Sequence, residues 1–326
     1  MKKIIGVALI LVVVLFALPF VVRQAQDTGQ DPQPTAQEEA ALPDSGHTLR
    51  VKGSDGQVTE MDLNQYLWGV VAAEMPASFS QEALKAQACA ARTYTVVRQA
   101  SAHAAHPQAD VCTDSGCCQA YVERQAAETR WGISAGTYSA KISQAVADTD
   151  GLGILYQGAP IQAVFFSSAP GQTADAVAVW GSQVDYLKSV SSPERDEVPN
   201  YRSQVVLTAE EVRSRVLAAY PGADLSGDPS GWFGTPASSG GAVTSIPVGG
   251  VTLTGSQVRT LFSLRSAAFT VAWDGTSFTF SVTGYGHGVG MSQYGANAMA
   301  KEGSSFRDIL TWYYTGAQVD DLWAES

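Results

Sequence analysis

Positive charge is scarce in this sequence. Its 326 residues carry 20 lysines and arginines against 31 aspartates and glutamates, which leaves a formal net charge of −11 at pH 7. Proteins that bind nucleic acid collect phosphates with a surplus of basic side chains, so this composition argues against a nucleic-acid partner. It still permits an anionic substrate held by a few local groups. Hydrophobic residues make up 45% of the chain and charged residues 16%, which is typical of a globular protein and not of a disordered one.

Charge is missing altogether from one long stretch near the N-terminus. Lys2 and Lys3 precede an uninterrupted apolar run, residues 4–22, and Arg23 follows it. As a helix this run nearly matches the hydrocarbon thickness of a bilayer. No convincing cleavage site precedes Asp27, so the pattern favours an uncleaved transmembrane anchor over residues 1–23 rather than a signal peptide. The basic residues predict that the N-terminus lies inside the cell membrane and the rest of the chain outside it.

The remainder divides into a linker and one domain. Residues 24–46 are rich in Gln, Pro and acids and lack a periodic apolar pattern, which is typical of a disordered linker. Residues 47–326 carry mixed helix and strand signals without a regular βαβ alternation or an internal repeat, so they predict a single α+β domain. Within it, residues 226–241 are rich in Gly, Ser, Pro and Asp and read as a surface excursion.

Several local signals predict where elements begin and end. Residues 47–63 alternate and turn at Gly53–Gly56, which indicates a short hairpin. Asp62 with Gln65 resembles a capping box that opens a helix ending before Pro76. Further expected features are a helix capped by Ser80, strands in residues 153–172, 243–255 and 269–284, and two final helices capped by Ser292 and Ser305 and closed by Gly303 and Gly316.

Glu74 is the only acid between Asp62 and Glu82, at the end of an apolar helical segment. The negative end of the helix dipole and apolar neighbours both disfavour a charged carboxyl, so its pKa should be raised. A raised pKa is what a general acid near neutral pH requires. An exposed glutamate at a frayed helix end is the alternative that residue type alone favours.

Cysteine and histidine are also scarce, with four of each, yet four of these eight lie within thirteen residues: His106, Cys112, Cys117 and Cys118. They suffice for a closed, tetrahedral structural zinc site. A disulfide from Cys112 to Cys117 or Cys118 is the alternative for a domain outside the cytoplasm, whereas adjacent cysteines form only a strained bridge. Cys89 lies in a helical pattern and is predicted to be a core residue.

Residues 284–303, GYGHGVGMSQYGANAMAKEG, surround His287 with glycines and lead into a helix. Exposed N–H groups ahead of a helix N-terminus resemble an anion cradle. The loop does not fit a dinucleotide-binding fingerprint. A glycine-rich bend packed tightly against a neighbouring segment is the structural alternative. Donors and acceptors on His287, Ser292, Gln293 and Tyr294 favour a loop that faces a substrate.

Together these stretches resemble the stage II sporulation protein D family. The resemblance runs from about residue 49 to 320 and is most specific in LNQYLWGVVAAEMPASFSQEALKAQACAARTY and in GYGHGVGMSQYGANAMAKEGSSFRDILTWYYTG. Members of the family are membrane-anchored lytic transglycosylases that cut peptidoglycan strands already stripped of stem peptides during engulfment of the forespore. The chain departs from relatives at Cys117, where they often carry histidine, and at Pro170, where they usually show a Gly-Gly pair.

The resemblance implies roles for particular residues. Glu74 corresponds to the family's catalytic glutamate, and His106, Cys112, Cys117 and Cys118 to its zinc site. The family's partners are stage II sporulation proteins P and M. We expect the substrate to be bound by His287, Gly288, Ser292, Gln293, Tyr294, Ser167, Ser168 and Arg265.

The implied reaction breaks the bond between N-acetylmuramic acid and N-acetylglucosamine and leaves a 1,6-anhydro end. The sugar's own C6 hydroxyl attacks, so one carboxyl suffices where ordinary glycoside hydrolysis needs two. The lactyl carboxylate bared by stripping is expected at the helix N-terminus near Ser292, or at Lys85, Arg92 or Arg265. The alternatives are a zinc-dependent peptidoglycan amidase and a non-catalytic glycan-binding scaffold.

Overall fold

The computed structural model describes Asp44 and residues 46–101 and 104–324. The predicted anchor, residues 1–23, and nearly all of the predicted linker, residues 24–46, lie outside the described residues. None of the helices within the described ranges is long and apolar enough to cross a membrane. Residues 42–326 group into one compact unit, whereas the domain boundaries predicted from the sequence stay predictions.

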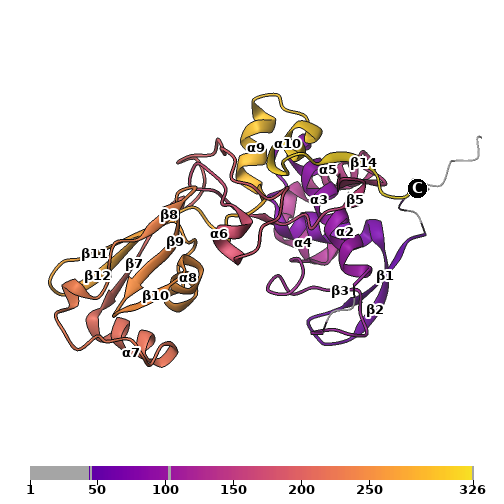
Figure 1. Cartoon of the computed structure of the whole chain (residues 1–326). Helices are drawn as coiled ribbons and strands as arrows, with labels where there is room; N and C mark the ends of the chain where they lie inside the picture. Colours follow the sequence, from indigo (N-terminus) through magenta and orange to yellow (C-terminus); the bar gives the residue numbers. More distant parts are fainter. Residues whose placement is uncertain (1–43, 45, 102–103, 325–326) are drawn as a thin grey trace, which may run out of the picture. The chain divides into compact units, whose positions relative to one another are not determined.

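Helices and strands are both present, which confirms the α+β class (Figure 1). The helices are α2 (Leu63–Glu74), α3 (Gln81–Gln99), α4 (Arg124–Trp131), α5 (Ala135–Ala147), α6 (Ala176–Trp180), α7 (Ala209–Ala219), α8 (Gly255–Phe262), α9 (Gln293–Lys301) and α10 (Phe306–Tyr313), with 3₁₀ turns η1 (Gly132–Ser134) and η2 (Pro229–Gly231). The strands are β1 (Thr48–Lys52), β2 (Val58–Asp62), β3 (Val111–Cys112), β4 (Leu152–Tyr156), β5 (Ala159–Pro160), β6 (Phe165–Phe166), β7 (Arg202–Thr208), β8 (Ala237–Ser239), β9 (Ala242–Val248), β10 (Val251–Leu253), β11 (Phe269–Trp273), β12 (Ser277–Thr283), β13 (Met291–Ser292) and β14 (Gln318–Asp321).

Helix α3 is the centre of the first hydrophobic core. It packs against α2, α5, α9, α10 and β4. Its buried face is rich in alanine, and such small side chains let the neighbouring helices approach closely. The alanines on that face are Ala83, Ala86, Ala88, Ala90 and Ala91. Cys89 is fully buried among them, as predicted for a core residue. Both α2 and α9 pack against α3, and these two helices carry the candidate site.

Strands β7 to β12, with α7 and α8, enclose a second hydrophobic core. The order β11-β12-β7 forms one antiparallel sheet and β10-β9-β8 another. Residues 226–241 do more than form a surface excursion, because Trp232 is buried against Phe278 and β8 pairs with β9. Two cores within one compact unit were not predicted from the sequence.

Most of the local signals are confirmed. β1 and β2 form the expected hairpin, and Asp62 caps α2 by accepting hydrogen bonds from the backbone N–H groups of Asn64 and Gln65. Ser80 does precede α3, but its side chain makes no capping bond. Its backbone N–H instead donates to Asn297 Oδ1 at 2.8 Å. Ser292 and Ser305 cap α9 and α10 as predicted.

Short β-pairings connect the glycine loop with a segment far away in the sequence. β6 pairs in parallel with β13, and Ser168 forms an antiparallel bridge with Tyr285. Residues 164–170 therefore run alongside residues 284–292, more than a hundred positions further on. Both ends of the glycine loop are held by these pairings, so contacts within the protein fix the course of its backbone.

A buried ion pair links the start of the domain to its centre. Arg92 of α3 and Asp44 are both 0% exposed, and Nε of Arg92 lies 2.6 Å from Oδ2 of Asp44. The guanidinium also donates to the carbonyls of Leu152 and Val146. Trp323 Nε1 donates to the other Asp44 oxygen at 3.1 Å. Both ends of the described chain therefore converge on one carboxylate.

Replacing Asp44 with alanine should lower the free energy of unfolding by about 3–5 kcal/mol, because it leaves the Arg92 charge buried without its partner. Chemical denaturation measures this loss. The matched control is Asp196→Ala, which breaks a pair with Arg202 whose side chains are 73% and 75% exposed and should change stability little. Equal losses in the two variants would contradict the prediction.

Candidate functional site

Glu74 stands at the C-terminal end of α2, and its carboxyl group is largely enclosed. Oε1 accepts a hydrogen bond from the backbone N–H of Ala120 at 2.7 Å, and Oε2 accepts one from Nε2 of Gln293 at 3.3 Å. Burial raises the pKa of Glu74, and the two hydrogen bonds oppose part of that rise. The carboxyl group therefore keeps its proton to a higher pH than an exposed glutamate does.

Gln293, the first residue of α9, is only 5% exposed and connects three helices. Its Nε2 donates to Glu74 on α2 and, at 3.4 Å, to Oε1 of Gln87 on α3. Gln87 is fully buried and was missed in the sequence, although a lone glutamine on the alanine-rich face of a helix is a usable signal. Gln293 thus positions the Glu74 carboxyl.

Ala120, which holds the other Glu74 oxygen, follows the cysteine-rich segment by two residues. Gln119 between them is buried and donates to Thr95 Oγ1 at 3.1 Å. The backbone at Ala120 is therefore fixed from both sides, by α3 and by the cysteine loop. No residue type marks a backbone donor, so this contact has no signal in the sequence.

The glycine loop is built for its own packing. Gly284, Gly286, Gly288 and Gly290 all have positive φ, between 77° and 116°. A Cβ at Gly284, Gly286 or Gly290 would overlap Ser168, Phe166 or Val164 respectively. Of the two interpretations of this motif, the structure favours a bend packed tightly against residues 164–170. The glycines there are required by the close approach of the protein's own chain.

His287 is held by that packing. Its Nδ1 accepts from the Val289 backbone N–H at 3.2 Å, so Nε2 carries the proton and donates to the Phe165 carbonyl at 2.9 Å. The ring lies between those of Phe166 and Trp180, with centroids 5.5 and 5.7 Å away. Burial lowers the pKa of His287 to about 4, so the ring is neutral. Both ring nitrogens are engaged by the backbone and not turned to a sugar.

A carboxylate of the protein itself, that of Glu194, lies at the N-terminus of α9. Ser292 is fully buried; its hydroxyl accepts from the Gly295 N–H and donates to Oε1 of Glu194. Glu194 is itself buried and also accepts from the Ala169 N–H at 2.6 Å and from the Ser192 hydroxyl at 2.5 Å. The expectation that a lactyl carboxylate binds at Ser292 is therefore wrong, because an internal carboxylate lies there. Nothing in the sequence around Glu194 signalled this role.

The other expected substrate-binding residues lie in or next to the paired segments 164–170 and 284–292. Ser168 is buried in its bridge to Tyr285, and the Tyr294 N–H donates to the Ser167 carbonyl at 3.0 Å. The Tyr294 ring packs edge-on against Phe79. Gly288 accepts at its carbonyl from the Ala174 N–H at 2.7 Å. Their roles toward a substrate stay predictions.

Of the three alternative anion partners, two are engaged within the protein. Arg92 belongs to the buried pair with Asp44, and Lys85 lies 3.0 Å from Glu82 and 2.9 Å from Asp148. Arg265 is different, because its guanidinium stacks on the Tyr285 ring 4.1 Å from the centroid and forms none of the ion pairs of the described residues.

His106, Cys112, Cys117 and Cys118 form one cluster whose ligand atoms all lie within 4.8 Å of one another. No disulfide joins any two of the described cysteines. His106 Nδ1 donates to the Ala109 carbonyl at 3.0 Å, which leaves Nε2 facing Cys118 Sγ at 3.2 Å. A backbone partner on the second nitrogen is the usual way to orient a ligating histidine. This cluster can bind a metal ion.

The donor set also argues for a cation. Without one, burial and the neighbouring thiols raise the pKa of Cys117 to about 12, since three thiolates in one place repel one another. A divalent ion reverses this preference because thiols bind metals in their deprotonated form.

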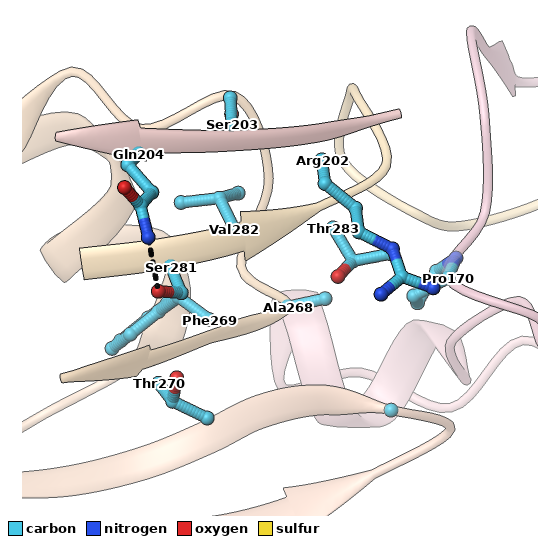
Figure 2. Close-up of a pocket in the computed structure, with 11 residues that line it drawn as sticks. Pro170, Arg202, Ser203, Gln204, Ala268, Phe269, Thr270, Ser281, Val282 and Thr283 are labelled. Carbon is cyan, nitrogen blue, oxygen red and sulfur yellow. Dashed lines mark hydrogen bonds between the residues drawn. The ribbon is translucent and has the colours of Figure 1, made fainter. Parts of the chain in front are cut away.

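A pocket of about 790 Å³ lies elsewhere. Figure 2 shows that it lies over one face of the β11-β12-β7 sheet, with the Arg202 side chain near Pro170 and a hydrogen bond from Gln204 to Ser281. None of the predicted site residues lines it, and it contains no carboxyl group. Size alone therefore does not locate the chemistry.

This α+β chain is similar to a class of sporulation proteins. The family model described as stage II sporulation protein matches residues 52–156, a range that includes Glu74, Ala120 and the four cluster residues. The chain is 36% identical to stage II sporulation protein D of Bacillus subtilis strain 168, over 96% of this chain and 92% of that protein. It belongs to the stage II sporulation protein D family.

Two further relatives extend the comparison. Stage II sporulation protein D of Bacillus amyloliquefaciens is 34% identical over 97% of this chain and 93% of its own length. A Bacillus subtilis protein named amidase enhancer is 28% identical over 78% of this chain, but only 40% of that larger protein is covered.

The purified protein should carry one tightly held divalent cation per chain, and Cys118→Ser should lose it, because the variant removes one of four ligands. Elemental analysis by mass spectrometry gives the stoichiometry. Cys89→Ser is the matched control, since Cys89 is a buried thiol outside the cluster, and should keep the ion. Equal metal content in the wild type and the Cys118 variant would contradict the assignment.

Proposed function

We propose that this protein is a lytic transglycosylase that acts in sporulation. Its substrate would be peptidoglycan strands without stem peptides, cut between N-acetylmuramic acid and N-acetylglucosamine to leave 1,6-anhydro ends. One observation carries the proposal: a single carboxyl, Glu74, is enclosed enough to raise its pKa and is aimed by two hydrogen bonds from separate segments. Family membership supports the same reaction.

The chemistry requires one group that first gives and then takes a proton. The protonated Glu74 carboxyl donates to the glycosidic oxygen as the bond from C1 to that oxygen breaks. The C6 hydroxyl oxygen of the same muramic residue forms a new bond to C1, and its proton passes to the Glu74 carboxylate. No water is consumed, and Glu74 ends the cycle protonated.

Among the described residues, Glu74 is hydrogen-bonded by the Ala120 N–H and the Gln293 amide and by no second carboxyl group, which agrees with such a mechanism. A retaining or inverting hydrolase needs two carboxyl groups on opposite sides of the scissile bond. Glu194 is the other enclosed acid near α9, but its oxygens are occupied by Ala169, Ser192 and Ser292 and it is 1% exposed. It therefore cannot reach a glycan.

The metal would be a structural zinc ion held by His106, Cys112, Cys117 and Cys118. A bound zinc ion supplies positive charge that keeps the three thiols deprotonated and closes the loop. The cluster is followed directly by Gln119, which is hydrogen-bonded to α3, and by Ala120, whose N–H binds the Glu74 carboxyl group. A metal-bound loop would therefore help to hold this N–H in position.

The cellular setting follows from the N-terminal pattern and the family. We propose a single-pass anchor at residues 1–23, with the domain outside the cytoplasm and next to the cell wall. Stage II sporulation proteins P and M are the proposed partners. A net charge of −11 gives no support to nucleic acid as a ligand.

A second candidate function is a non-catalytic scaffold that assists an amidase. The name of one relative, amidase enhancer, favours it. A zinc amidase has less support, because four protein ligands leave no open position on the metal and His287 is tied to the backbone. Product masses separate the candidates: 1,6-anhydro ends support a transglycosylase, and released peptides an amidase.

Glu74→Gln should lower the rate of cleavage of stem-peptide-free glycan by about 10²- to 10⁴-fold, since the amide cannot transfer a proton. Its thermal stability at pH 7 should be no lower than that of the wild type, because a neutral side chain avoids the cost of burying charge. Mass spectrometry of the products and calorimetry measure the two effects. Retained turnover in a folded variant would rule out the acid/base role.

The reaction should slow as pH rises through the raised pKa of Glu74, because the first step needs the protonated carboxyl. Gln293→Leu removes a hydrogen bond that favours the ionised form, so this alkaline limb should move to higher pH. Rates across a pH series test the shift. Gln204→Leu, an exposed glutamine on β7, is the control and should leave the profile unchanged; a shift toward lower pH in the Gln293 variant contradicts the assignment.

A further inference from the structure

A small pocket of about 410 Å³ lies beside the glycine loop. Two arginines dominate it: Arg259, from the last turn of α8, and Arg265, just beyond that helix. Tyr285 of the glycine loop forms one wall, and the remaining lining residues are Thr260, Ser263 and Leu264. The pocket thus concentrates two positive charges and no acid, in a chain whose net charge is −11.

Each of these guanidinium groups has a buried donor that no described residue satisfies. Nε of Arg259 and Nε of Arg265 are both buried, and neither has a hydrogen-bond partner among the described residues. Neither arginine belongs to an ion pair of those residues. Buried donors without partners destabilise the fold, and an anion that accepts from them would offset that cost.

A purely structural role explains less. Arg259 lies at the C-terminal end of α8, where a positive charge is favourable for the helix dipole. Arg265 stacks on Tyr285, which anchors its guanidinium plane. Neither role uses the buried Nε donors. Two guanidinium groups in one pocket also repel each other unless an anion lies between them.

The pocket is connected to the candidate site through the backbone. The Gly286 N–H donates to the Arg265 carbonyl at 2.9 Å, and Tyr285 is bridged to Ser168. From Tyr285 the chain passes through His287 and reaches Gln293, the residue that positions Glu74. A ligand that contacts both the arginine pocket and Glu74 would therefore lie along residues 285–293.

The same surface exposes two aromatic rings. Tyr285 and Trp180 are each 44% exposed. Trp180 packs on His287, and Arg259 lies near enough to His287 to disfavour its protonated form. Exposed aromatic side chains next to a charged pocket are typical of a binding site for an amphipathic ligand, and a sugar ring offers one apolar face and many hydroxyls.

We propose that Arg259, Arg265 and Tyr285 form a subsite for a carboxylate carried on a sugar, namely the lactyl carboxylate of muramic acid. This inference rests on the proposed function, because removal of the stem peptide turns that group from an amide into a free anion. Arginine pairs with carboxylates through two parallel hydrogen bonds. The pocket would distinguish stripped strands from peptide-bearing ones by charge.

The test measures binding, not turnover. Isothermal titration of the full chain carrying Glu74→Gln compares stem-peptide-free glycan fragments with chitooligosaccharides of equal length, which lack the lactyl group. The muramic fragments should bind about tenfold or more tightly, an amount that one charge-assisted pair supplies. Arg259→Gln with Arg265→Gln should abolish this preference and leave chitooligosaccharide affinity unchanged. Arg215→Gln, an exposed arginine on α7, is the charge-matched control and should keep it.

A muramic preference that survives the double substitution, or that is missing from the Glu74→Gln chain itself, overturns the proposal. If the double variant does not fold by circular dichroism, Arg265→Gln and Arg265→Lys replace it, and the preference should fall in both because lysine lacks the paired donors. Failure of the proposed function appears separately, as a wild-type chain that forms no anhydro ends yet still prefers the carboxylated fragments.

Discussion

The carboxyl group of Glu74, held between the Ala120 N–H and the Gln293 amide, is the constraint on which the candidate site depends. The two donors come from segments that are 173 positions apart, and each follows an unusual stretch of sequence. Ala120 follows the cysteine loop, and Gln293 follows the glycine loop. Two motifs that look independent in the sequence therefore serve one side chain, because each fixes the backbone that presents one hydrogen-bond donor.

The glycine loop holds the backbone at Gln293 in place through its own packing and not through a catalytic side chain. Positive φ at alternate residues lets the chain pass close to residues 164–170, and the buried Glu194 satisfies the first turn of α9 through Ser292. An internal carboxylate at a helix N-terminus gains from the dipole and from the Ser292 and Ser192 hydroxyls. In the function that we propose, recognition of the glycan falls to Tyr285 of this loop, whose ring is exposed.

How much could be predicted depended on the distance over which each signal acts. The β1–β2 hairpin, the caps at Asp62, Ser292 and Ser305 and the four-residue cluster were predictable, because the interacting residues lie within a few positions of one another. Glu74 was predictable as a buried acid from its apolar neighbours and the following Pro76. Gln87, Glu194 and the pairing of Asp44 with Arg92 were not, since each depends on packing between distant segments. Ser292 was predicted correctly as the cap of α9. Its prediction as a ligand site was wrong, because no local pattern in the sequence indicates that Glu194 lies there.

The ion pair between Asp44 and Arg92 also sets where the folding unit begins. Within the described residues, the first strand starts at Thr48, and a boundary at residue 47 looks natural from the sequence alone. A chain trimmed to that point would keep every helix and strand of the described residues. It would lose the ion-pair partner of the buried Arg92 guanidinium and the acceptor of the Trp323 indole N–H. The N-terminal boundary of the folding unit is therefore set by the buried Arg92 charge and not by the first strand. Asp44 contacts both Arg92 and Trp323, so one aspartate binds the beginning of the unit to its centre and to its C-terminal end.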